Sequence, residues 1–214
     1  PIVLGEIDGV SVAFLVRHGN PHRIAPHRVN YRANIAVLKA LGVREIVAIN
    51  AVGGIADWAG AGALALPAQL IDYTDGRISS FSDFDERAVE HVDFSDPFTE
   101  SLRLRLKQAA LSTDVAIQDG GVIAVTQGPR LETRAEIIRL RRDGCDLVGM
   151  TSMPEAVLAR EAGLAYAAIA VVANPAAGCA GDQVIGMHEI ELTLAAAMER
   201  VLRLVRAFLA RAPE

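Results

Sequence analysis

The chain has 214 residues, a length typical of one domain or at most two. Apolar residues make up 51% and charged residues 22%, which excludes the composition of a disordered chain. The 21 basic and 26 acidic residues leave a net charge of −5, and the chain has no basic tract. Both features argue against a protein that binds the phosphate backbone of nucleic acids.

Cysteine usage and hydropathy narrow the class further. The two cysteines, Cys145 and Cys179, form no Cys-x-x-Cys motif, so neither a disulfide framework nor a thiolate zinc site is favoured. No apolar run reaches the roughly 18 residues of a membrane span, and no signal-peptide pattern opens the chain. We therefore expect a cytoplasmic protein without a membrane partner.

The first part of the chain predicts three strands and a helix. Ser11–Val16 is a short apolar run that predicts a buried strand. Asn30 is a suitable N-cap for a helix over Tyr31–Leu41, whose apolar residues fall on one face. Glu45–Asn50 is a second apolar strand, and Ala63–Tyr73 is a third strand candidate.

The middle of the chain begins with a long polar interval. Asp75–Asp96 shows no periodicity and predicts a long loop, a feature that is usually functional or disordered in compact domains. Thr99–Ala110 has helical periodicity. Val115–Thr126 contains Asp119-Gly120-Gly121, which predicts a pair of strands joined by a tight turn.

The last part alternates helices and strands. Helices are predicted over Glu132–Arg142, from Pro154 to Gly163, and over His188–Arg211. Between them lie a strand at Asp146–Met150 and a nearly all-apolar strand at Ala165–Ala173, which implies burial on both faces. This alternation predicts a single α/β domain, 1–214, with a mixed central β-sheet flanked by helices.

Polar residues follow five of the predicted strands. In α/β folds the chemistry gathers at the carboxyl ends of strands, so this shared placement predicts a site there. The groups are Arg17-His18, Asn50-Ala51, Gln127 to Glu132, Met150-Thr151 and Asn174.

Each group also has a structural interpretation. Arg17 and His18 suit an anion, but an arginine at a strand end is often only solvated. The glycines of Val52-Gly53-Gly54-Ile55 can present backbone N–H groups or simply form a loop. Glu132 suits a helix N-terminus as well as a ligand, and Asn174-Pro175 is also a turn signal.

Other residues have a default structural role. Met150 is by default a core residue, and His91 a solvated residue of the long loop. His18, His22 and His27 have spacings that fit no standard metal site, so no metal is predicted.

Taken in order, these segments resemble the trimeric purine nucleoside phosphorylase and methylthioadenosine phosphorylase family. The resemblance covers essentially the whole chain, and His91–Ser95 and Asn174–Gly178 are most similar to bacterial members that act on S-methyl-5'-thioinosine. The segments that carry it are Arg17-His18-Gly19, Val29–Asn34, Asn50–Gly54, Gln127–Thr133, Val148–Glu155 and Asn174–Gly178.

The resemblance implies the nucleoside phosphorylase fold and phosphorolysis. Inorganic phosphate attacks C1' of a purine nucleoside, so phosphate is a co-substrate and no cofactor is expected. The absence of a carboxylate pair for glycoside hydrolysis is consistent with that nucleophile. The phosphate site implied by the family contains Arg17, His18, Asn50, Ala51 and Thr151.

The resemblance also implies a base site. Val52, Gly53 and Leu131 line the base, while Met150 lies under the ribose. Ionised Glu132 accepts from N1–H of a 6-oxopurine, and Asn174 donates to O6 or N7, stabilising the departing base. Members acting on 6-aminopurines carry Asp at the position of Asn174, so hypoxanthine is the expected base.

The 5' end of the sugar is the second specificity question. The family builds this pocket from the segment 184–190, where Met187 and Ile190 favour a methylthio group. His188 in the same segment would instead favour a 5'-hydroxyl. The residue that matches His91 reaches across from a neighbouring subunit in methylthio members, so a homotrimer is expected.

The expected reaction is thus phosphorolysis of S-methyl-5'-thioinosine to hypoxanthine and 5-methylthioribose 1-phosphate. The alternatives are an inosine/guanosine phosphorylase, a methylthioadenosine phosphorylase and a non-catalytic nucleoside-binding module. The chain begins at Pro1, and the family's Gly-rich N-terminal phosphate turn has no counterpart in it. We expect that turn to precede Pro1.

Overall fold

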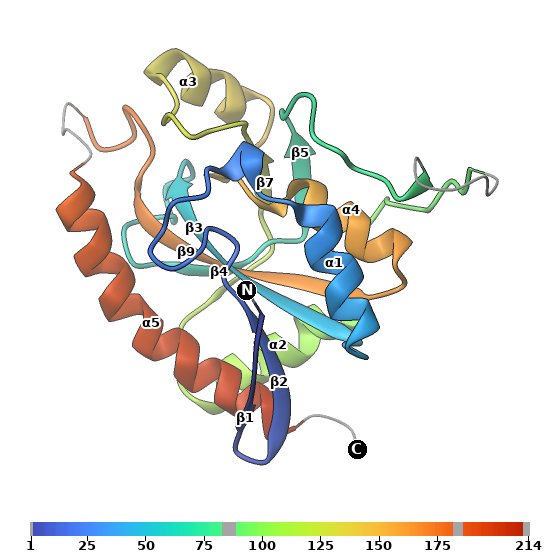
Figure 1. Ribbon diagram of the computed structural model, residues 1–214. Helices are drawn as coiled ribbons and strands as arrows, with labels where there is room; N and C mark the ends of the chain where they lie inside the picture. The colour runs from blue at the N-terminus through green and yellow to red at the C-terminus, as the bar shows by residue number, and fades with distance from the viewer. Residues whose placement is uncertain (1, 83–88, 182–185, 212–214) are drawn as a thin grey trace.

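The computed structural model describes residues 2–82, 89–181 and 186–211, apart from the side chain of Met187 (Figure 1). Its elements, in chain order, are β1 (Ile2–Ile7), β2 (Val10–Leu15), a 3-10 turn at Pro26–Arg28, α1 (Tyr31–Ala40), β3 (Glu45–Gly54), β4 (Leu64–Leu66), β5 (Gln69–Asp72), α2 (Glu100–Ser112), β6 (Gln118–Asp119), β7 (Val122–Val125), α3 (Arg134–Arg142), β8 (Leu147–Gly149), α4 (Ser152–Glu161), β9 (Ala165–Pro175) and α5 (Met187–Leu209).

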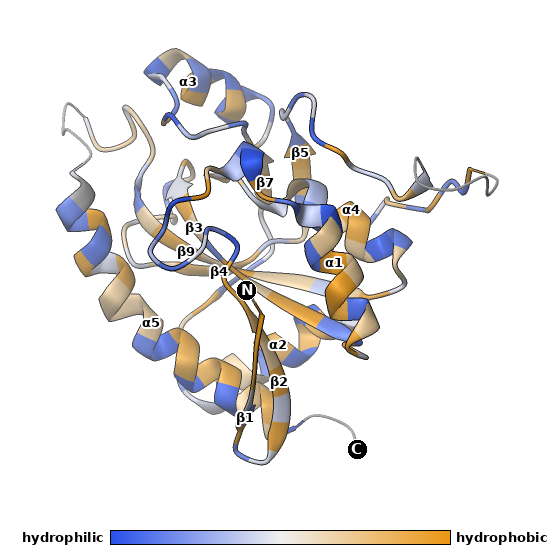
Figure 2. Cartoon of the chain, in the orientation of Figure 1, coloured by the Kyte–Doolittle hydropathy of each residue, from blue (hydrophilic) through white to orange (hydrophobic). Residues whose placement is uncertain are grey.

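A mixed sheet in the order β5-β7-β8-β3-β9-β4-β6 forms the centre of the molecule. Strands β3 and β9 run parallel from Glu45↔Ala165 onward, whereas β8 meets only the end of β3 and runs antiparallel to it. The two long strands are mostly apolar, with polar residues at only a few positions (Figure 2). The predicted fold class, a mixed sheet flanked by helices, is confirmed.

Strand β9 shows how the helices cover both faces of the sheet. Its side chains at 166, 168, 170 and 172 pack in the same apolar cluster as α1 and α4, while those at 167, 169 and 171 pack with α2 and α5. A strand with period-2 side chains and a helix layer on each face must be apolar throughout. The sequence interpretation of Ala165–Ala173 as a strand buried on both faces is therefore confirmed.

Helix α5 covers one side of the sheet along its length (Figure 1). Its buried face contains Ala197, Val201, Leu204 and Phe208, and its exposed face mixes charged residues with the exposed Leu192 and Leu202. No helix in the described ranges is both long and apolar enough to cross a membrane.

The strand predicted over Ser11–Val16 exists as β2, but the prediction that it is buried was wrong. It pairs antiparallel with β1, which the sequence analysis did not identify, in a separate two-stranded sheet. Phe14 is 44% exposed, whereas the neighbouring Ala13 and Leu15 pack against the apolar cluster that contains α1 and α4, so β2 is covered on one face.

Two other strand predictions were wrong in their pairing. Ala63–Tyr73 divides at Pro67 into β4 and β5, which lie toward opposite edges of the sheet. The predicted strand pair in Val115–Thr126 is not a hairpin, because β6 pairs with β4 whereas β7 pairs with β5 and β8. The division at Pro67 has a simple cause. Proline lacks the N–H needed to continue a ladder, so the chain changes strand partners at that residue.

The end of β3 also differs from the prediction. The strand continues from Asn50 to Gly54, with a register shift against β9 between Val52 and Gly53. A Cβ on Gly54 would lie 1.8 Å from the carbonyl oxygen of Ala59, so only glycine fits at this close approach. The residues expected after the strand therefore lie inside it.

Candidate active site

The first cluster of the site is built around a buried ion pair. Arg17 Nε and Nη2 donate to the two carboxylate oxygens of Glu155 at 2.6 and 2.7 Å. The two side chains are only 14% and 4% exposed, and Tyr166 Oη donates to the same carboxylate at 3.0 Å. Burial by itself would lower the pKa of Arg17, but the Glu155 carboxylate raises it, so the guanidinium stays charged.

This ion pair lies beside the predicted phosphate-site amide and hydroxyl. Arg17 Nη1 donates to the carbonyl of Ile49, next to Asn50, at 3.3 Å. Asn50 Nδ2 donates to Ser152 Oγ at 3.0 Å, and Thr151 Oγ1 donates to Asn50 Oδ1 at 3.5 Å. Arg17, Asn50 and Thr151 are thus brought together next to the start of α4, whose first turn is interrupted by the non-helical backbone of Met153.

His18 is fixed close to Arg17 by its own backbone loop. Its Nδ1 donates to the carbonyl of Ile24 at 2.7 Å, because a carbonyl can only accept. The ring stacks on His22 with centroids 4.4 Å apart, and burial lowers the pKa of His18. A neutral ring held in this way presents Nε2 as an acceptor.

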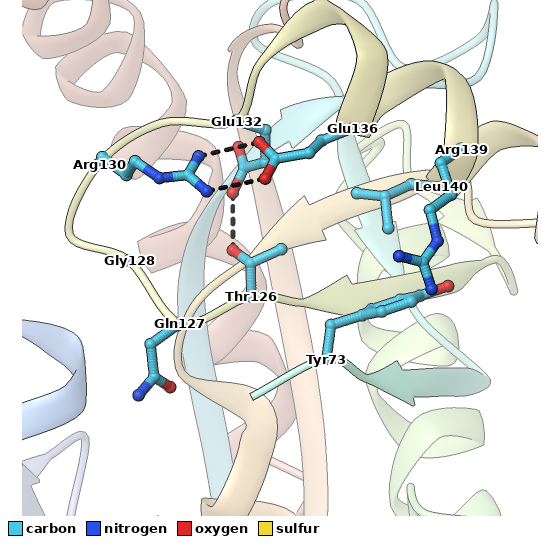
Figure 3. A pocket seen from close by; sticks show the side chains of 9 residues that line it. All are labelled: Tyr73, Thr126, Gln127, Gly128, Arg130, Glu132, Glu136, Arg139 and Leu140. Atoms are coloured by element: carbon cyan, nitrogen blue, oxygen red, sulfur yellow. Dashed lines mark hydrogen bonds and ion pairs between the residues drawn. The ribbon is translucent and has the colours of Figure 1, made fainter. Parts of the chain in front are cut away.

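Glu132 lies before α3, not within it as predicted. The helix begins at Arg134 because Thr133 and Glu136 form a capping box. Glu132 Oε1 accepts from Thr126 Oγ1 at 2.6 Å (Figure 3). The carboxylate lines a cavity of about 260 Å³ that also contains Gln127, Tyr73 and Arg139, of which the last two were not predicted.

Arg130 does not contribute a free cation to this cavity. Its guanidinium forms a bidentate pair with Glu136 at 2.7 and 2.8 Å. That pair and the Thr133 cap lower the pKa of Glu136 to about 2. In Figure 3 the side chain of Gln127 turns away from the Glu132 carboxylate.

Asn174 lines a second cavity, of about 210 Å³, between the end of β9 and the start of α5. Its Nδ2 donates to the carbonyl of Pro175 at 2.7 Å. The predicted Ile190 lines the same cavity, as do Glu189 and Thr193, which the sequence analysis did not select. The two residues expected to read the base thus line different cavities.

Of the predicted ribose and base residues, Val52 and Gly53 lie in β3 and Met150 directly follows β8. Gly128 adopts a φ of +58°, and a Cβ there would lie 2.4 Å from Met150 Sδ, so the side chain of Met150 lies against the loop before Glu132. Val52 is buried and lies against Gly149. Gly53 pairs with Val148 on one side and with Asn174 on the other. Ala51, expected in the phosphate site, is exposed. Leu131 is 47% exposed.

The predicted role of His91, from a neighbouring subunit, and the predicted role of Met187 are not tested by the described residues of this chain. His91 is exposed on the segment 89–98, which lies across the molecule from the start of α5 in Figure 1. Arg160 Nη1 holds that segment by donating to the carbonyl of Asp93 at 3.2 Å. Met187 is the first residue of α5, and its side chain lies outside the described residues, as do positions 184 and 185.

The structure also places Glu155, Ser152 and Arg77 among these groups, although the sequence alone predicted no role for them. Glu155 and Ser152 belong to Val148–Glu155, one of the segments that carry the family resemblance, and a buried carboxylate near an arginine is a pairing that burial prediction could have suggested. Arg77 follows Gly76 in a polar interval, and no local pattern distinguishes it.

Comparison with known proteins shows the family. A model of the phosphorylase superfamily matches residues 1–210. The chain is 56% identical over 190 residues to a probable S-methyl-5'-thioinosine phosphorylase of Xanthomonas campestris pv. campestris, covering 89% of this chain and 76% of the relative. It is 39% identical to a 6-oxopurine nucleoside phosphorylase of Pyrococcus furiosus, covering 100% and 82%.

A solved structure supports the same relationship. Methylthioadenosine phosphorylase from Schistosoma mansoni, in complex with adenine, superimposes with a TM-score of 0.92 at 31% identity. The match covers 98% of this chain and 79% of that one.

Proposed function

The chain belongs to the phosphorylase superfamily, and on that basis we propose that it is a purine nucleoside phosphorylase that acts on S-methyl-5'-thioinosine. The products would be hypoxanthine and 5-methylthioribose 1-phosphate. Five relatives, at 39–56% identity, carry the name probable S-methyl-5'-thioinosine phosphorylase. The observation that carries the proposal is the cluster of Arg17, Asn50 and Thr151 beside Met150 and Gly128.

The cluster suits inorganic phosphate as the nucleophile. It offers a fixed cation and two neutral hydrogen-bonding side chains. Because Glu155 already balances the charge of Arg17, the neutral donors must supply much of the attraction for phosphate. Holding phosphate under C1' converts a bimolecular attack into an oriented one.

The base-reading proposal depends on Glu132 and Asn174. An ionised Glu132 accepts from N1–H of hypoxanthine, and adenine has no donor there. Asn174 donates toward N7 or O6 and stabilises negative charge on the departing base. A wrong base would leave buried polar groups unpaired, which weighs against methylthioadenosine as the substrate.

The second candidate is an inosine or guanosine phosphorylase. Glu189 and Thr193 favour it, because they give the cavity shared by Asn174 and Ile190 polar groups that a 5'-hydroxyl could bond. Ile190 favours the methylthio group instead. We propose further that His91 completes this pocket from a neighbouring subunit in a homotrimer.

The test follows free base by chromatography with four nucleosides, each with and without phosphate. Methylthioinosine, methylthioadenosine, inosine and guanosine are compared for the wild type and Asn174→Asp. We expect phosphate-dependent hypoxanthine release, fastest from methylthioinosine, and a shift of the variant toward methylthioadenosine by about 10²-fold or more.

Other results of this assay would contradict particular parts of the proposal. Faster release from inosine would overturn the 5'-pocket assignment, and adenine release by the wild type would overturn the roles of Glu132 and Asn174. Release without phosphate would contradict phosphorolysis. No turnover of any nucleoside would favour a binding module.

A further inference from the structure

Arg77 reaches four backbone carbonyls that belong to two different segments of the site. Its Nη2 donates to the carbonyls of Thr126 and Gln127 at 3.2 and 2.9 Å. Its Nη1 donates to the carbonyls of Met150 and Met153 at 2.8 and 2.6 Å. One guanidinium therefore joins the segment that leads to Glu132 with the segment that carries Thr151.

Gln127 locks the backbone that carries Arg77. Arg77 Nε donates to Gln127 Oε1 at 3.0 Å, and Gln127 Nε2 donates in turn to the carbonyl of Asp75 at 2.8 Å. This explains why the Gln127 side chain turns away from Glu132 in Figure 3. Gln127 thus holds both the guanidinium of Arg77 and the backbone two residues before it.

The cation is held mostly by neutral groups. Burial lowers the pKa of Arg77, and its guanidinium carbon lies 5.7 Å from the centre of the Tyr31 ring. The four carbonyls and the Gln127 side chain all accept through amide oxygens. An arginine fork can satisfy this many acceptors in one plane, whereas a lysine ammonium has only three donors.

The bonds of Arg77 lie where the ladder between β7 and β8 ends, and this position indicates what they do. The parallel ladder of β7 and β8 ends at Val125↔Gly149, and Thr126 N makes the last bond across it, to Gly149 O at 2.8 Å. Beyond Thr126 and Gly149 the two segments separate, one leading to α3 and the other to α4. The bonds of Arg77 span this separation and enclose Thr151 and Ser152 between the carbonyls of Met150 and Met153.

We propose that Arg77 is a positioning residue that sets the distance between the base-reading loop and the ribose and phosphate segment. This inference rests on the proposed function, since it assigns Glu132 to the base and Thr151 to phosphate. Reacting groups must be held closely, and a displacement of about 1 Å can cost about 10²-fold in rate. Losing Arg77 would release both segments at once.

The test compares Arg77→Met, which keeps the apolar stem, with Arg77→Lys, which keeps the charge. Arg105→Met on α2 is the matched control, because Arg105 pairs with Glu45 away from the site and is also partly buried. All variants are assayed well below their unfolding temperatures.

The first readout is amide hydrogen exchange, which does not depend on any substrate. In Arg77→Met we expect exchange to rise about 10-fold or more in both 126–133 and 150–153, with β3 and β9 unchanged. Arg105→Met should leave both segments protected. A rise throughout the chain, or in only one segment, would overturn the proposal.

The second readout is kinetic. For Arg77→Met we expect kcat/KM to fall about 10²-fold, with KM rising for both phosphate and nucleoside. Arg77→Lys should retain more activity than Arg77→Met. Unchanged kinetics with both segments loosened would also overturn the positioning role.

The two proposals fail in different ways. If the wild type releases no purine from any nucleoside, the proposed function fails, while the exchange experiment still decides whether Arg77 joins the two segments. If phosphorolysis is present but Arg77→Met behaves like Arg105→Met, only the inference about Arg77 fails.

Discussion

Arg17 shows how a single residue depends on partners far away in the chain. Its guanidinium is paired with Glu155, which is 138 positions later, and the pair is closed by Tyr166. The attraction within a buried pair roughly offsets the cost of removing both charges from water, but removing one member leaves an uncompensated buried charge. The residue expected to bind phosphate is therefore also part of the protein's core.

Arg17→Met should have two separable effects. We expect the free energy of unfolding to fall by about 3–5 kcal/mol, because Glu155 is left buried and unpaired. Urea denaturation measures this, and the double variant Arg17→Met/Glu155→Gln should recover part of the loss. In the variants that remain folded, KM for phosphate should rise far more than KM for the nucleoside. Equal increases in both would contradict the phosphate role.

At the scale of elements, the end of β3 determines where the site residues lie. Gly53 and Gly54 allow the strand to pass close to Ala59 and to meet β8 as well as β9. This carries Asn50 and Ala51 into the strand instead of a flexible loop. Their positions are consequently set by ladder hydrogen bonds rather than by a turn.

Gly54→Ala should be strongly destabilising. The added Cβ would lie 1.8 Å from a backbone oxygen that cannot rotate away, so we expect a loss of about 3 kcal/mol or more in the free energy of unfolding. Gly60→Ala is the control, because a Cβ there meets nothing within 4 Å. Thermal unfolding of the two variants gives the comparison. Similar midpoints would show that β3 can shift to accept a side chain.

For the whole molecule, acid stability should depend on His18. Burial lowers the pKa of the folded His18, with smaller lowering contributions from His22 and Arg17, whereas the hydrogen bond to the Ile24 carbonyl and the charge of Glu155 oppose it. In the unfolded chain the ring has its ordinary pKa of about 6.5. Below that pH the unfolded state binds a proton that the folded state does not, so stability falls with decreasing pH.

We therefore expect the free energy of unfolding to decrease from about pH 7 downward, over the window between the ordinary and the lowered pKa. His18→Asn should flatten this dependence, since an amide does not titrate and can still donate to Ile24. His188→Asn, at an exposed position, is the control. Urea denaturation at a series of pH values measures the slope. An unchanged slope in His18→Asn would contradict the assignment.

The sequence by itself determined which segments are apolar, where several helices begin and end, and which polar residues follow the strands. Asn30 caps α1 as predicted, and the all-apolar run of β9 predicted its burial. These features are local, because caps and periodicity depend on residues a few positions apart. The mixed α/β architecture followed from their alternation.

Only the tertiary structure decided which partners these segments take. Pro67 divides one predicted strand into two that lie toward opposite edges of the sheet. Glu132 and Asn174 line different cavities. The sequence offered Glu155 only as a carboxylate in a segment that carries the family resemblance, without naming Arg17 as its partner, and no local pattern distinguished Arg77 as the bridge between two loops. Hydrogen bonds between residues tens to hundreds of positions apart depend on how the strands are ordered in space, and a short window of sequence does not contain that order.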